Sequence, residues 1–276
     1  MKKYILTDET ITIDGCILHR IQAVNTFGTI KEGDFGGFVG SGINLSHEGL
    51  AWVDGDAKVY ENAQVYGNAW VHGDANISGE TKVYGNTQVF GDACVYGNAL
   101  VHDDAQVYGD ARVYGNAEVY GDARVYGYSE VLEDAHVCKN AQVYGDAHVY
   151  GHAVVFGNAQ VYGCAHVHGN AEICGGAQVY GYAQVYGNAL VYGDAMLSSS
   201  NCIVVVSNIG SRNAPTTFFK TATGISVATG CFIGTLDEFT TRVAKTHGTN
   251  EHFTDYMAAI EFAKLMLRDR DMKGEN

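Results

Sequence analysis

The sequence predicts a mainly-β chain built around a parallel β-helix solenoid, with a small α+β region at its C-terminal end. The main observation is a six-residue repeat, A-x-V-Y-G-[N/D], which runs from Ala51 to Ser200 as 25 consecutive hexads without insertion or deletion. A period of six does not suit an α-helix, because 3.6 residues per turn would scatter the apolar positions around the helix. The repeat therefore predicts stacked strands.

Each hexad reads as one short strand followed by one corner. In an extended chain successive side chains point to opposite faces, so the Val of AQVYGD at 105–110 points inward and its neighbours point outward. Gly tolerates positive φ, Asn or Asp can hydrogen-bond its own backbone, and Ala fits a tight inner corner. A strand this short buries an apolar face only by stacking on others, as in a solenoid.

The hexad rule resembles the left-handed parallel β-helix, in which three hexads form one triangular coil of 18 residues. This resemblance implies the handedness and the triangular section, and it gives about eight coils for the repeat. With strands about 4.8 Å apart, the rod would be roughly 40 Å long. No loop is expected to project from it.

A coil of 18 residues places one outward aromatic side chain above another. One column holds five tyrosines, namely Tyr108, Tyr126, Tyr144, Tyr162 and Tyr180. So much outward aromatic surface favours an oligomer interface, and the resemblance to the hexapeptide family favours a homotrimer. The alternative is that the stacked rings stabilise only the rod itself.

The charge of the chain is negative and uneven. The formal net charge is −14, and the repeat holds 17 acidic but 5 basic side chains. This acidic rod argues against direct binding of nucleic acid or of anionic membrane surfaces. One corner column carries aspartates that are interpreted as turn formers, namely Asp56, Asp74, Asp92, Asp110 and Asp146. Cation binding along this column and mimicry of a nucleic-acid backbone are the alternatives.

The composition also bears on the cellular compartment. No apolar run approaches the roughly 20 residues of a membrane span, and the N-terminus turns acidic at Asp8 before a signal-peptide core can form. The seven cysteines include no CxxC pair, which suits a reducing compartment. We expect a cytoplasmic protein (in the host-cell cytoplasm if a phage encodes it) without a cofactor.

The two ends depart from the repeat, so we divide the chain into 1–50, 51–200 and 201–276. Residues 1–50 are expected to form an N-terminal cap that grades into the first coil, since an open solenoid end exposes strand edges. Their Gly-rich stretch, 33–42, lacks the GK[ST] of a phosphate loop.

Residues 201–276 read as a small α+β domain. Strands are expected over 203–206, 216–221 and 225–232, which would bury Cys231. The capping box of Thr235 and Glu238 predicts a helix that reaches His247 and ends at Gly248. A second helix is expected from Glu251 to Arg270.

A candidate ligand site follows the first of these strands. Ser211, Arg212 and Asn213 occupy an expected turn, and Thr217 and Lys220 come shortly after it. Guanidinium, hydroxyl and amide groups of this kind hold small anionic ligands such as nucleotides. The alternative is a polar turn in which Arg212 pairs with a local carboxylate.

A candidate metal site lies in the repeat. His148 and His166 are 18 residues apart, His168 shares their face, and Glu130 is one coil below His148. Imidazole and carboxylate groups at this spacing suit zinc or nickel. The alternative is a set of surface histidines without a metal.

Two segments carry a family resemblance: LHRIQAVNTFGTIKEGDFGGFVGSGINLSHEG (18–49) with the first hexads, and IGSRNAPTTFFKTATGISVATGCFIGTLDEF (209–239). They resemble uncharacterised hexapeptide-repeat, transferase-like proteins of enterobacteria and their phages and prophages. This resemblance implies a phage or prophage setting. We expect a non-enzymatic oligomer that binds a host factor or a small signalling nucleotide in host–phage interaction, including defence inhibition, or that serves as a structural spacer.

The alternative is an acyltransferase-like enzyme. Such enzymes typically use a histidine as a general base beside a projecting loop, and the uninterrupted hexads offer no such loop. We therefore favour the non-enzymatic interpretation.

Overall fold

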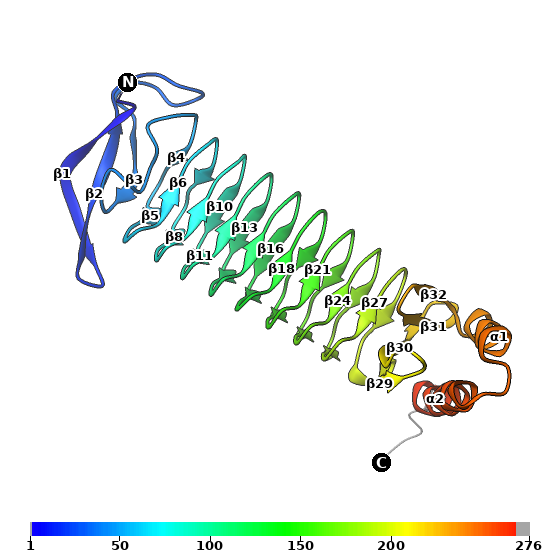
Figure 1. The fold of residues 1–276 in the computed structure, drawn as a ribbon. Coiled ribbons are helices and arrows are strands. Elements are labelled where there is room, and N and C mark those ends of the chain that lie inside the picture. Colours follow the sequence, from blue (N-terminus) through cyan, green and yellow to red (C-terminus); the bar gives the residue numbers. More distant parts are fainter. Residues whose placement is uncertain (1, 269–276) are drawn as a thin grey trace, which may run out of the picture.

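The computed structural model, which describes residues 2–268, is a long rod of stacked coils with a sheet at its N-terminal end and a small α+β unit at the other (Figure 1). The mainly-β class and the parallel β-solenoid are confirmed. The longest all-parallel face has nine strands, so the rod has about nine turns. Residues 35–50 add a coil before the first hexad, because Phe38 pairs with Lys58 and Leu45 with Val65.

Three faces run along the rod, and each is one sheet. The 11-stranded face consists of β1 (Tyr4–Ile13), β2 (Cys16–Ala23), β3 (Phe35–Val39), β5 (Lys58–Val59), β8 (Asn76–Ile77), β11 (Cys94–Val95), β14 (Arg112–Val113), β17 (Glu130–Val131), β20 (His148–Val149), β23 (His166–Val167) and β26 (Gln184–Val185). The 9-stranded face consists of β4 (Trp52–Val53), β7 (Trp70–Val71), β10 (Gln88–Gly91), β13 (Gln106–Gly109), β16 (Arg124–Gly127), β19 (Gln142–Val143), β22 (Gln160–Val161), β25 (Gln178–Val179) and β28 (Met196–Leu197). The 8-stranded face consists of β6 (Gln64–Val65), β9 (Lys82–Val83), β12 (Leu100–Val101), β15 (Glu118–Val119), β18 (His136–Val137), β21 (Val154–Val155), β24 (Glu172–Ile173) and β27 (Leu190–Val191).

The interior of the rod is a column of small apolar side chains. The Val of each hexad and the Ala that opens it are fully buried along the rod, as in Ala105 and Val107. Where Thr or Ser replaces Ala, the buried hydroxyl donates to the carbonyl three residues earlier, as Thr87 does to Tyr84 at 2.6 Å. The substitution therefore leaves no unsatisfied hydroxyl in the core.

The corners use the left-handed backbone region throughout. Gly127 has φ of +75°, and a Cβ there would lie 3.0 Å from the backbone nitrogen of Gly145 in the next coil. Glu61, Asp103 and Glu133 hold the same conformation without glycine. Each of these carboxylates accepts a hydrogen bond from a backbone N–H one coil further on, which offsets the cost of positive φ.

The N-terminal cap is an antiparallel hairpin, β1 with β2, joined to the rod through β3. It closes the open end of the core over the buried ring of Trp52. Lys3 is 5% exposed, and its ammonium donates to the carbonyl of Ala51 at 2.6 Å and lies over the ring of Phe27. Burial lowers the pKa of Lys3 to about 8 and raises that of Tyr4 to about 12.

The C-terminal unit is an antiparallel sheet with two helices. After η1 (Ser200–Cys202), the chain forms β29 (Ile203–Ile209), β30 (Ala214–Thr221), β31 (Gly224–Thr229), β32 (Phe232–Thr235), α1 (Leu236–His247) and α2 (Glu251–Leu267). No helix in the described part of the chain is long and apolar enough to span a bilayer.

One expected strand proves to be two. The prediction of a single strand over 225–232 is wrong, because Gly230, at φ of +53°, turns the chain between β31 and β32. Cys231 lies in that turn and is exposed, not buried. The capping box of Thr235 and Glu238 is present at the start of α1. The expected end of the second helix at Arg270 lies outside the described residues.

The C-terminal sheet separates two apolar cores. Phe219 and Ala228 pack into the core of the rod, whereas Phe218 and Val227 pack against the helices. The backbone N–H of Leu190 in β27 donates to the Thr217 hydroxyl at 3.0 Å. The sheet therefore covers the last coil with one face and carries both helices on the other.

The burial of Lys3 predicts a distinct pH dependence. A lysine whose pKa is lower in the folded chain destabilises it while charged, so stability should rise with pH from about 8 toward the unfolded value of 10.5. Between pH 8 and 10 we expect a gain of about 2 kcal/mol relative to Lys3→Met, measured by urea denaturation followed through tryptophan fluorescence. Lys31→Met, which replaces an exposed lysine, is the control, and its stability should depend on pH as that of the unmodified chain does. If the free energy of unfolding depends on pH in the same way for all three proteins, the prediction is wrong.

The corner geometry predicts a position-dependent glycine effect. Gly127→Ala should destabilise by the roughly 1–2 kcal/mol of the left-handed conformation plus a further cost, because its Cβ meets the next coil. Gly187 has φ of +70° with nothing within 4 Å of its Cβ position, so Gly187→Ala should show the conformational cost alone. Thermal denaturation of both variants measures the difference, and equal losses would show that coil spacing is not limiting.

Candidate functional site

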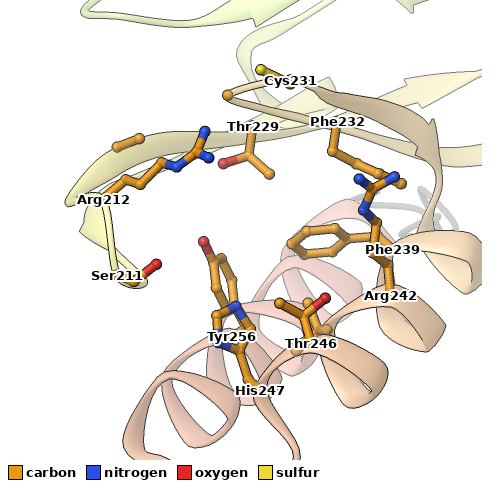
Figure 2. A pocket seen from close by; sticks show the side chains of 13 residues that line it. Ser211, Arg212, Thr229, Cys231, Phe232, Phe239, Arg242, Thr246, His247 and Tyr256 are labelled. Carbon is orange, nitrogen blue, oxygen red and sulfur yellow. The ribbon is translucent and has the colours of Figure 1, made fainter.

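A cavity of about 250 Å³ lies in the C-terminal unit, between two strand turns and the helices (Figure 2). The β29–β30 turn contributes Ser211 and Arg212, the end of β31 contributes Thr229, and the β31–β32 turn contributes Cys231. The helices close the other side. The cavity therefore lies at the tip of the sheet.

Two guanidinium groups dominate the charge of this cavity. Figure 2 shows Arg212 and Arg242 reaching in from opposite sides, one from the β29–β30 turn and one from α1. Neither has an ion-pair partner within residues 2–268, and no carboxylate of that range lines the cavity. Arg242 lies over the ring of Phe232, with 5.7 Å from Cζ to the ring centroid. The cavity is cationic although the chain carries a net charge of −14.

Tyr256 forms the floor between the two arginines, and its hydroxyl points into the cavity (Figure 2). Its ring meets Phe239 edge-on at 5.4 Å and His247 at 5.5 Å. Gly210 permits this placement, because its φ is +70° and a Cβ there would overlap the Tyr256 hydroxyl. The tyrosine is thus fixed from three sides.

The helices place their cavity residues by ordinary helical periodicity. Phe239, Val243 and Thr246 recur at spacings of four and three, so they lie on one face of α1. The capping box fixes where α1 begins, and Gly248 ends it with a hydrogen bond to Ala244. The chain then reverses into α2, whose Asn250 side chain caps it by accepting from Phe253 N–H.

The structure brings together only part of the predicted ligand site. Ser211 and Arg212 line the cavity, but Asn213 lies in the turn at φ of +48° and does not line it. Thr217 is 1% exposed and faces the rod. Lys220, further along β30, is also outside the cavity lining. Asn213, Thr217 and Lys220 therefore do not line this cavity, although Thr217 lines a second cavity on the rod side of the sheet, and their part in a ligand site stays a prediction.

Sequence reasoning missed the contribution of the helices. Arg242, His247 and Tyr256 come from parts of the chain 30 or more residues beyond Arg212. His247 is the last residue of α1 and also lines the cavity. One sequence feature could have indicated Arg242. It lies next to the apolar positions Phe239 and Val243 of the predicted helix, at the boundary of the buried face.

The predicted metal set does not assemble. The rings of His148 and His166 stack at 4.9 Å and 5°, and parallel rings direct their nitrogens side by side, not toward one point. His168 stacks on Tyr150 instead, and Glu130 approaches His148 at 3.6 Å. Burial and these neighbouring histidines lower the pKa of His166. No metal-binding group of three or more His, Cys, Asp or Glu side chains occurs among residues 2–268.

The predicted tyrosine column is a continuous stack on the 9-stranded face. Neighbouring rings from Tyr108 to Tyr180 lie 4.9–5.1 Å apart and nearly parallel, and Phe90 and His72 extend the stack. The hydroxyls of Tyr126, Tyr144 and Tyr162 donate to a glutamine one coil further on. The rings are half-buried. Its role as an oligomer interface stays a prediction.

Comparison with known proteins supports the fold. A family model described as the YdcK beta solenoid repeat matches residues 105–121 and 183–199, both within the repeat. The chain is similar to that family there and is a repeat β-helix protein. No curated protein matches the chain.

The contact between Gly210 and Tyr256 predicts strong coupling. Gly210→Ala should destabilise the C-terminal unit because its methyl overlaps the ring, whereas in the background of Tyr256→Ala the same change should cost only the left-handed conformation. A double-mutant cycle by thermal denaturation should give a coupling of at least about 1 kcal/mol. Additive losses would mean that the tyrosine is not held where Figure 2 shows it.

Proposed function

We propose that this chain is a non-enzymatic binding protein whose C-terminal unit holds a small anionic ligand. The observation that carries the proposal is the cavity with two guanidinium groups, Arg212 and Arg242, and no carboxylate among its described lining residues. Guanidinium groups hold phosphates and carboxylates through charge-assisted hydrogen bonds in a fixed geometry. The hydroxyls of Ser211, Thr229 and Tyr256 add donors around them.

The electrostatics of the whole chain support a local anion site. Arg212 and Arg242 are both exposed, so water screens their mutual repulsion, and an anion that lies between them would be attracted by both charges. The acidic rod also disfavours the general binding of polyanions, because its charge repels them. A small anion that enters the cavity is therefore favoured over nucleic acid.

The biological setting is proposed from the resemblance of the sequence. We propose host–phage interaction, in which the protein occupies a host factor or withholds a small signalling nucleotide, and a homotrimer formed through the tyrosine column. The structural-spacer role belongs to the same interpretation. The acyltransferase alternative would require coenzyme A to bind and turn over, which the same binding assays can include.

Anion binding should depend on Arg212. Pyrophosphate titrated into the protein by calorimetry should bind, and Arg212→Ala should weaken it at least tenfold, because the variant removes one of two charged donors. Arg124→Ala is the matched control, since it removes an exposed arginine from the rod. Raising the ionic strength should also weaken binding.

Two results would contradict the proposal. One is no detectable binding of pyrophosphate, inorganic phosphate or any nucleotide by the unmodified protein. The other is binding that Arg124→Ala weakens as much as Arg212→Ala does, because this would place the anion outside the cavity.

A further inference from the structure

A second cavity, of about 330 Å³, adjoins the first. It lies between the last coils of the rod and the C-terminal sheet, where β24 and β27 of the 8-stranded face meet β30 and β31. Ala214, Thr229 and Gly230 line both cavities. These shared residues, at the end of the sheet, form the ridge between the two cavities, and Gly230 adds no side chain to it.

The second cavity is chemically different from the first. Its polar side chains are a carboxylate, Glu172, two amides, Asn170 and Asn188, and the hydroxyls of Thr217 and Thr229. Glu172 is exposed and has no ion-pair partner within residues 2–268. It can therefore accept N–H hydrogen bonds from a ligand.

Asn188 ends a column of corner amides. The Asn170 amide donates to the Asn188 oxygen at 3.0 Å, as Asn98 does to Asn116 further down the same column. No coil stacks above Asn188, and its own amide N–H groups make no hydrogen bond to residues 2–268. An exposed donor pair consequently stands beside the Glu172 acceptor at the mouth of the second cavity.

The remaining walls are apolar. Leu190 lies on the rod side, and Pro215 and Ala228 lie on the sheet side. Apolar walls with a few directed polar groups are typical of small-molecule and cofactor sites. The first cavity alone is small for an organic ligand and the second is at the lower end of the usual range, whereas together they fall well within that range.

We propose that the ligand is a nucleotide that spans both cavities. Its phosphate lies between Arg212 and Arg242, the sugar crosses the ridge at Gly230, and the base lies against Leu190 and Pro215. Glu172 accepts a base N–H, and Asn188 donates to a ring nitrogen or carbonyl. This inference rests on the proposed anion site and adds which part of a nucleotide each cavity holds and which residues select the base.

The test compares inorganic phosphate with the four nucleoside 5′-monophosphates by calorimetry. We expect the tightest nucleotide to bind at least tenfold more tightly than inorganic phosphate. Glu172→Ala and Asn188→Ala should each weaken that nucleotide several-fold, because they remove the contacts to the base. Asp146→Ala, which removes an exposed carboxylate from another corner, is the control and should have no effect.

The affinity for inorganic phosphate shows whether Glu172→Ala weakens nucleotide binding by removing a contact to the base or only by changing the local charge. Glu172→Ala removes a negative charge near the anion site, so it should leave inorganic phosphate binding unchanged or tighter while nucleotide binding falls. A uniform electrostatic effect would move both ligands in the same direction. If the affinity for the nucleotide falls while the affinity for phosphate does not, Glu172 contacts the nucleotide in the second cavity.

The possible results of these titrations distinguish the two-cavity nucleotide from the proposed anion site. If phosphate binds in an Arg212-dependent manner but no nucleotide binds more tightly, or if Glu172→Ala and Asn188→Ala leave the nucleotide unaffected, the two-cavity ligand is wrong and the anion site stands. If neither phosphate nor any nucleotide binds, both proposals are wrong.

Discussion

The rest of the rod depends on an 18-residue register held by parallel backbone hydrogen bonds. Each residue of the repeat lies above its counterpart one coil earlier, as Arg124 does with Gln106 and Val125 with Val107. Strands in a sheet lie 4.7–4.9 Å apart, and the aromatic rings stack at almost the same spacing. The spacing between hydrogen-bonded coils thus determines the spacing of the stacked side chains. It also brings the glycine corners of neighbouring coils close together.

The same constraint explains why the ends of the rod differ from its middle. A periodic strand stack buries its core only between coils, so the first and last coils need another element to cover them. The hairpin of β1 and β2 does this at one end, and the face of the C-terminal sheet that carries Phe219 does it at the other. Because the opposite face of that sheet is then free, it holds two helices, and the cavities form where the periodic ladder stops.

Much of the fold follows from the sequence, but the candidate site follows only in part. The hexads predict the solenoid because each position has one environment repeated many times. Arg212 could be found because it follows an apolar run at a turn. Arg242 and Tyr256 could not, because only the packing of α1 and α2 on the sheet brings them to that turn.

Two features of the C-terminal strands could not be predicted from the sequence: the face of β30 on which Thr217 lies, and the turn at Gly230. Alternation assigns a strand's faces only when apolar and polar residues alternate, and the adjacent Phe218 and Phe219 are both buried, one toward each core. The pattern therefore did not show that Thr217 faces the rod. In the same way, the apolar run around Cys231 concealed the turn at Gly230, although glycine at positive φ marks such turns.

The stacked columns of the rod show why side chains that repeat from coil to coil stabilise the structure but do not form a binding site. A residue type that recurs every 18 residues lies in a ladder, and ladder geometry aligns side chains in parallel: histidines stack as His148 and His166 do, and amides form chains as Asn98 and Asn116 do. Parallel groups satisfy one another, whereas a binding site needs groups that converge on one point. Convergence requires elements that cross the ladder at an angle, and the described chain supplies these where the sheet and helices close the last coil. At this end the outermost amide of a ladder, on Asn188, is also left with donors to offer a ligand.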